Sequence, residues 1–225
     1  MAQSYDFLRD CKLNTLQYLQ YHAAQNSQRL AIVTPQGKLT YGALVSLVEG
    51  IAKRLNGLGV LSGARVELLV ENDAGAFILS LALQRLGCIC SIPFAKSQIG
   101  LVPCEYYLDD HLVEGHPAKP LIITEDWFAF SAQRDAGSAL PEGFASIHSL
   151  AVITSSTGTT GQPKTIGSTI EKLHHSIFVG LHHPGQAAGK APCLVAVKFG
   201  SLWGYRQMLT VLWSEGHWSL RVVSP

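Results

Sequence analysis

The chain has 225 residues, of which 47% are hydrophobic and 15% charged, and its formal net charge is +1. A chain of this length typically buries roughly 70% of its unfolded surface, so a substantial core is expected and disorder of the whole chain is not. The 17 basic residues are scattered along the sequence. With a net charge so close to zero, this argues against DNA or RNA as the partner.

The N-terminus does not have the pattern of a secretory signal, because residues 1–14 include acids and no uninterrupted apolar stretch. No run reaches the ~18 apolar residues that a membrane helix needs. The five cysteines are odd in number and lie mostly in apolar segments, which predicts reduced core thiols and a cytoplasmic protein. Cys88 and Cys90 alternate onto one strand face without further metal ligands nearby, so we expect core packing there.

The first half of the sequence alternates between strand and helix patterns. The predicted elements are a helix at 14–25, a strand at 30–34, a helix opened by Thr40 and stopped by Gly59, a strand at 66–70, a helix from Asn72 or Asp73 to Leu86, and a strand at 88–93. This order predicts an α/β fold with a mostly parallel sheet flanked by helices. In such folds, binding sites form beyond the carboxyl ends of the strands.

The second half is less regular. Residues 125–149 mix aromatic, charged, glycine and proline residues and predict a loose connection. The predicted elements around it are strands within 117–124, at 150–156, at 193–198 and at 219–223, and helices at 170–181 and 202–212.

A loop rich in hydroxyls and glycines follows the apolar strand at 150–156. Residues 155–164 read SSTGTTGQPK, which places five hydroxyl side chains, two glycines and one lysine within ten residues. Glycines let backbone N–H groups approach an anion, hydroxyls donate further hydrogen bonds, and a lysine adds a compact positive charge. The composition therefore suits the binding of a polyphosphate.

Two other interpretations of this loop stay open. It is also the composition of a flexible turn that binds nothing. The spacing from Gly158 to Thr165 matches a Walker-type GxxxxGKT loop, but Pro163 stands where the second glycine belongs and supplies no N–H. The residues after Lys164 are β-branched, so we expect the loop to join two strands rather than to open a helix.

Two segments in the correct order resemble the adenylate-forming superfamily. Residues 153–164, ITSSTGTTGQPK, resemble the AMP-binding signature of acyl-CoA synthetases, firefly luciferases and non-ribosomal peptide adenylation domains. Residues 39–92 resemble the region before that signature, in which Leu-Thr-Tyr opens a helix and an asparagine follows the next strand. The resemblance implies that residues 1–225 are the N-terminal part of an AMP-binding adenylation domain.

The resemblance implies an ATP-dependent ligase with Mg²⁺ that activates a carboxylic acid. The carboxylate attacks the α-phosphorus, pyrophosphate leaves, and the acyl-adenylate passes its acyl group to the thiol of CoA or of a carrier protein. The expected phosphate contacts are Ser156, Thr157, Gly158, Thr159, Thr160, Gly161 and Lys164. Catalytic residues are not assigned, and no metal ligand is expected.

The sequence lacks the later runs of the family. It has no Tyr-Gly-x-Thr-Glu, no Thr-Gly-Asp, no arginine hinge and no C-terminal catalytic lysine, so later subdomains and the C-terminal lid domain are expected to be absent. We therefore expect these 225 residues alone to be inactive. The alternative is a non-catalytic nucleotide-binding or protein-interaction module derived from an adenylating enzyme. An apolar surface that the missing parts would cover predicts self-association, for example as a homodimer.

Aromatic residues near 200 and a group of histidines have two interpretations each. Phe199, Trp203 and Tyr205 fit either an acyl pocket or simple core packing. Four histidines share one predicted helical stretch, and their spacing favours a solvated helix face over a metal site: His174, His175, His182 and His183. No GxSxG run supports a hydrolase.

Overall fold

The computed structural model describes residues 16–129, 140, 142–156, 164–181, 192–195, 199–213 and 217–220. Its helices and strands are interspersed along the chain. In order they are α2 (Leu16–Gln25), β1 (Leu30–Thr34), β2 (Gly37–Thr40), α3 (Tyr41–Gly57), β3 (Arg65–Leu68), α4 (Asp73–Leu86), β4 (Ile89–Ile92), η1 (Lys96–Gln98), β5 (Tyr106–Asp109), β6 (Lys119–Ile122), η2 (Glu125–Phe128), β7 (Leu150–Ser156), β8 (Lys164–Thr169), α5 (Ile170–Leu181), β9 (Pro192–Val195), α6 (Leu202–Trp213) and β10 (His217–Leu220).

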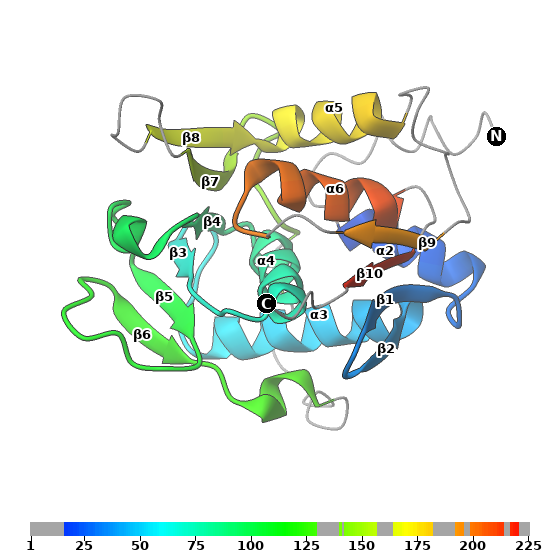
Figure 1. Cartoon of the computed structure of the whole chain (residues 1–225), viewed down its shortest axis with the longest axis horizontal. Coiled ribbons are helices and arrows are strands. Elements are labelled where there is room, and N and C mark those ends of the chain that lie inside the picture. The colour runs from blue at the N-terminus through cyan, green and yellow to red at the C-terminus, as the bar shows by residue number, and fades with distance from the viewer. Residues whose placement is uncertain are drawn as a thin grey trace.

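The strands form two sheets, with helices packed between and around them (Figure 1). The larger sheet has the order β6-β5-β3-β4-β7-β8, in which every neighbouring pair is parallel except β7 with β8. The smaller sheet has the order β2-β1-β10-β9 and is parallel except for β1 with β2. The predicted α/β class with a mostly parallel sheet flanked by helices is confirmed.

Two central helices start and stop where their capping residues stand. Thr40 caps α3, because its side chain accepts a hydrogen bond from the Ala43 N–H. Asn72 caps α4 in the same way through Ala74 and Gly75, and Gly87 ends that helix in the left-handed conformation at φ 75°. Of the two predicted caps for α4, Asn72 is therefore the one the chain uses.

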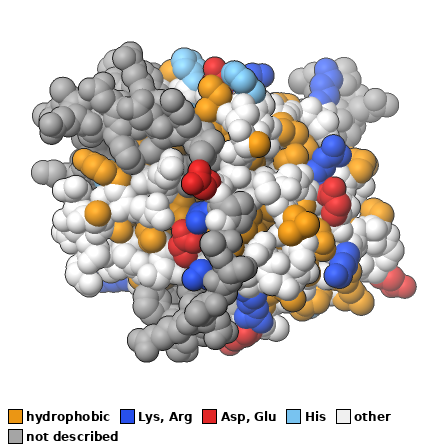
Figure 2. Space-filling model, turned by 180° about the vertical axis from the view of Figure 1, so that it is seen from behind, with side chains coloured by type: hydrophobic (Ala, Val, Ile, Leu, Met, Phe, Trp, Pro, Cys, Tyr) orange, Lys and Arg blue, Asp and Glu red, His pale blue; other side chains and the backbone are white. Residues whose placement is uncertain are grey.

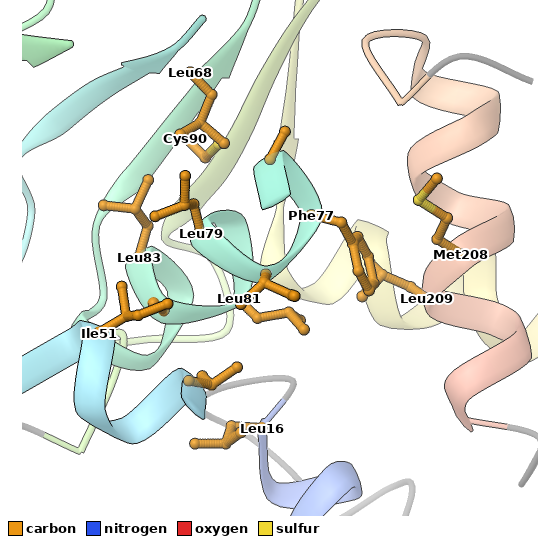
Figure 3. Packing of buried hydrophobic residues seen from close by; sticks show 14 of the residues in the cluster. Leu16, Ile51, Leu68, Phe77, Leu79, Leu81, Leu83, Cys90, Met208 and Leu209 are labelled. Atoms are coloured by element: carbon orange, nitrogen blue, oxygen red, sulfur yellow. The ribbon is translucent and has the colours of Figure 1, made fainter. Parts of the chain in front are cut away.

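Helix α4 is the centre of the core, because apolar residues lie on all its sides. Figure 3 shows Leu79 and Leu83 directed at Leu68 and Cys90 of the larger sheet. The ring of Phe77 lies on the side facing α6, where it makes edge contacts with Phe199 and Tyr205. Helix α4 packs on β3 and β4 of the larger sheet, whereas α3 and α6 pack on the smaller sheet, so several helices together join the two sheets. Among the described residues, no helix is long and apolar enough to cross a membrane.

The face seen in Figure 2 carries charged side chains of both signs. On the face seen in Figure 2, lysine, arginine, aspartate and glutamate side chains are interspersed with apolar ones. This agrees with the scattered charges of the sequence.

Several predictions need correction. Two strands were not predicted, β2 and β5, and the strands form two sheets rather than one. β10 begins two residues before the predicted strand at 219–223. His174 does not lie on a solvated helix face: its ring packs edge-on against Trp213 at 4.9 Å between centroids, while the neighbouring His175 is exposed. His182 and His183 lie outside the described residues.

Candidate functional site

The hydroxyl- and glycine-rich loop connects the antiparallel strands β7 and β8. The two strands pair up to its ends, with Thr154 opposite Ile166 and Ser156 opposite Lys164. The prediction that the loop joins two strands is therefore confirmed. Lys164 is exposed where β8 begins.

The structure locates two of the seven predicted phosphate contacts. The backbone of Ser156 ends β7 and that of Lys164 begins β8, so the two residues lie side by side. The other five lie outside the described residues: Thr157, Gly158, Thr159, Thr160 and Gly161. Their role in binding a phosphate remains a prediction.

The hairpin opens at the carboxyl edge of the larger sheet. β7 is parallel to β4, and Thr154 is the residue opposite Ile92, where β4 ends. β7 thus extends two residues further than its neighbour, and the loop leaves the sheet at the edge where α/β folds bind ligands. This position comes from strand order and register alone.

A cavity of about 550 Å³ lies at the same edge, where β3, β4 and β5 end. Its wall combines apolar side chains with a group of charged ones. The main lining residues are Leu68, Val70, Ile92, Phe94, Ile99, Val113, Phe199, Glu71, Asp73, Lys96, Asp109, Asp110 and His111. Cavities of this size and mixed lining are typical of small-molecule sites. Ile92 links the cavity to the hairpin because it lines the first and pairs with the second.

The segment that leads into α6 closes one side of the cavity. Phe199 is 3% exposed and lines the cavity together with Gly200. A Cβ atom at Gly200 would lie 3.0 Å from the Pro93 carbonyl oxygen, so even an alanine would crowd the backbone that follows β4. Close packing against the backbone that follows β4 therefore explains why a glycine stands after Phe199.

The three aromatic residues singled out from the sequence have three different environments. Phe199 lines the cavity, and Tyr205 is fully buried in the core, where the Gln84 amide donates a hydrogen bond to its hydroxyl. Trp203 is 67% exposed. Of these three residues, Phe199 is the one that lines the cavity, and Tyr205 belongs to the core.

Two consecutive carboxyl groups, Asp109 and Asp110, lie at the mouth of the cavity. Burial raises the pKa of Asp109, and a side-chain hydrogen bond with Asp110 raises it further. The same hydrogen bond lowers the pKa of Asp110, with His111 adding to the effect. The two pKa shifts have opposite directions, as expected for neighbouring carboxyl groups that interact with each other.

The ligand atoms of Asp109, Asp110 and His111 all lie within 4.8 Å of one another. Carboxylate oxygens and an imidazole nitrogen are metal ligands in many proteins, but exposed acidic groups of this kind are also common without an ion. The histidine prefers transition metals and the carboxylates prefer Mg²⁺, so the donor set does not select one ion. The group is a feature of the cavity mouth that the sequence prediction missed, because β5, which it follows, was not predicted.

In its sequence the chain is similar to the N-terminal part of adenylate-forming enzymes. A family model described as "AMP-binding enzyme" matches residues 19–99. This match includes residues 39–92, one of the two segments that carry the resemblance, and confirms the resemblance there.

Sequence relatives are distant and much longer than this chain. It is 27% identical over 155 residues to a malformin synthetase of Aspergillus sclerotiicarbonarius, a match covering 65% of the chain and 3% of that protein. It is 24% identical over 214 residues to an adenylate-forming reductase of Coprinopsis cinerea, covering 89% of the chain and 19% of the reductase.

Solved structures show the same fold. The N-terminal subdomain of Klebsiella oxytoca NpsA, in complex with 3-hydroxybenzoyl-AMSN, matches with a TM-score of 0.75 at 18% identity, over 93% of this chain and 54% of that one. O-succinylbenzoate CoA synthetase (MenE) of Bacillus subtilis, in complex with AMP, matches with a TM-score of 0.76 at 17% identity, over 91% and 55%. The chain thus spans about half the length of these structures.

Proposed function

We propose that the chain is the N-terminal portion of an ATP-dependent ligase that activates a carboxylic acid as its acyl-adenylate and transfers it to a thiol. One observation carries the proposal. The β7–β8 hairpin brings the two ends of the signature loop, Ser156 and Lys164, together at the carboxyl edge of the sheet, and the cavity lies at the same edge.

The loop would hold the polyphosphate of ATP. Gly158 and Gly161 would offer backbone N–H groups, the hydroxyls of Ser156, Thr157, Thr159 and Thr160 would donate further hydrogen bonds, and Lys164 would add its positive charge. The acid's carboxylate oxygen attacks the α-phosphorus, the bond to the bridging oxygen breaks, and pyrophosphate leaves. Catalysis of this kind depends on positioning and charge stabilisation, to which Mg²⁺ bound to the phosphates would contribute.

The cavity is the proposed site of the organic reactant. It is next to the hairpin, its wall combines apolar and charged side chains, and it is large enough for a single-ring or short-chain acid. The similar NpsA subdomain is described in complex with a hydroxybenzoyl-AMSN compound. We further propose CoA or a carrier-protein thiol as the acceptor of the acyl group, and a homodimer in the cytoplasm as the state and location of the protein.

ATP binding tests the loop assignment. We expect wild-type protein to bind ATP with Mg²⁺ in calorimetry, and Lys164→Ala to weaken binding about tenfold, which corresponds to about 1.4 kcal/mol. Lys172→Ala is the matched control, since Lys172 is also exposed but lies on α5. Equal affinity of the Lys164 variant and the wild type, or no binding by the wild type, would contradict the assignment.

The non-catalytic alternative rests on the absence of the later family motifs from this sequence. A pyrophosphate-release assay with a panel of carboxylic acids separates the two functions. We expect no acid-dependent release from these 225 residues. Brisk release would overturn that expectation and would support a complete catalytic site.

A further inference from the structure

Glu67 is a buried acid on the middle strand of the larger sheet. It is 0% exposed on β3, between Val66 and Leu68, which point to the opposite face. Its register neighbours are Ser91 on β4 and Tyr107 on β5, both also buried. A buried carboxylate is costly unless other groups donate hydrogen bonds to it, so its partners indicate why the fold retains it.

One oxygen of Glu67 connects two separate loops. We call residues 93–105 the first cavity loop and residues 110–118 the second. Glu67 Oε2 accepts a hydrogen bond from the Gly100 N–H of the first loop at 3.0 Å, and lies 2.7 Å from His116 Nε2 of the second. The side chains of Glu67 and His116 are each 1% exposed.

Both loops also line the cavity. The first contributes Phe94, Lys96 and Ile99, and the second contributes His111 and Val113. Both loops are hydrogen-bonded to the same oxygen atom of Glu67. The distance between the two cavity walls that the loops form therefore depends on Glu67.

The hydrogen bonds around His116 determine its tautomer. The Ala118 N–H donates to His116 Nδ1 at 3.1 Å, so the ring proton lies on Nε2 and is donated to Glu67. The ring of Tyr107 packs against the imidazole at 4.3 Å between centroids, and its hydroxyl accepts a hydrogen bond from the Val113 N–H. The second loop is thus attached at two points, at His116 and at Val113.

We propose that Glu67 and His116 are positioning residues that hold the two cavity loops in one arrangement and so set the shape of the cavity. Neither side chain reaches the cavity, so neither contacts a reactant there. The role in function rests on the proposed function, in which this cavity holds the organic reactant. The coupling of the two loops does not depend on it.

Hydrogen exchange resolved by peptide tests the coupling on the chain as it is, without nucleotide. Glu67→Ala should reduce protection of both loops about tenfold relative to the wild type, because each loses its hydrogen-bond acceptor. Glu67→Gln keeps an oxygen acceptor and should restore most of this protection in both loops.

Glu114→Gln is the matched control, because Glu114 is an exposed acid on the second loop and makes the same change of charge. We expect it to leave the protection of both loops unchanged. Loss of protection in only one loop, or protection in Glu67→Gln as low as in Glu67→Ala, would overturn the proposal. If Glu67→Ala does not fold, Glu67→Gln still decides it, because any loss of protection that it causes should affect both loops equally, and a loss in one loop alone would overturn the proposal. Failure of ATP to bind would contradict the loop assignment and leave this result unaffected.

Discussion

The two faces of the six-stranded sheet are built on different principles. Facing α4, the strands present apolar side chains such as Val66, Cys90 and Val152, each 0% exposed. The other face carries Glu67, Ser91 and Tyr107, which are neighbours on β3, β4 and β5. Here loops cover the sheet and hydrogen bonds attach them.

The first face therefore contributes mainly to the stability of the domain, and the second mainly to the position of the cavity loops. Apolar burial against α4 is non-directional and stabilises the whole domain in proportion to the area removed from water. The few hydrogen bonds on the opposite face contribute less energy but determine where the cavity loops lie. Substitutions on the first face should therefore lower global stability, and those on the second should mainly change the loops.

The largest expected effect is on the helical side. Phe77→Ala should lower the free energy of unfolding by about 3–5 kcal/mol, because the ring is fully buried between α4 and α6 and its removal leaves a cavity. Urea denaturation measures the change. Trp203→Ala, at a ring 67% exposed, is the control and should change stability by less than about 0.5 kcal/mol. Similar losses in the two variants would break the contrast between core and surface.

The buried His174 on α5 tests how a charge on the helical side affects the free energy of unfolding. Burial lowers its pKa to about 4 from an ordinary value of 6.5. The unfolded chain therefore binds a proton more readily, so this contribution to stability is complete above pH 6.5 and is lost as the pH falls toward 4. A full shift of this size corresponds to about 3 kcal/mol, which partial exposure reduces to about 2.

Denaturation at pH 7.5 and pH 4.5 measures the His174 contribution. The loss on acidification should be about 2 kcal/mol smaller in His174→Gln than in the wild type. His175→Gln changes the exposed neighbour and should behave as wild type. If His174→Gln loses as much stability in acid as the wild type does, His174 is not the group responsible.

The helices and most strands could be predicted because their signals are local. Apolar spacing and the caps Thr40 and Asn72 locate α3 and α4 within a few residues. The division into two sheets is not local: Ile32 of β1 pairs with Trp218 of β10, near the other end of the chain. No pattern within a short window specifies such a pairing.

The candidate site was only partly predictable for a related reason. The signature at 155–164 could be recognised from residue types, and its hairpin geometry followed from the β-branched residues after Lys164. The cavity required β5, whose residues include one aliphatic side chain, Leu108, between polar neighbours and so form no apolar run. Once Tyr106–Asp109 is recognised as a parallel strand, the rule that sites form at carboxyl ends points to Asp109 and Asp110.

The smallest expected effect compares two neighbouring tyrosines on β5 that point to opposite faces. Tyr107→Phe removes the hydroxyl that accepts the Val113 N–H, and should cost about 1–1.5 kcal/mol and lower hydrogen-exchange protection in residues 110–118. Tyr106→Phe also removes a hydrogen bond, to the Gly59 carbonyl, but at an exposed position where water can replace it. Its cost should be below about 0.5 kcal/mol, with the loop unchanged. Equal effects of the two variants on residues 110–118 would mean that the loop side of the sheet holds its loops by general packing, and that its directional hydrogen bonds do not set the cavity.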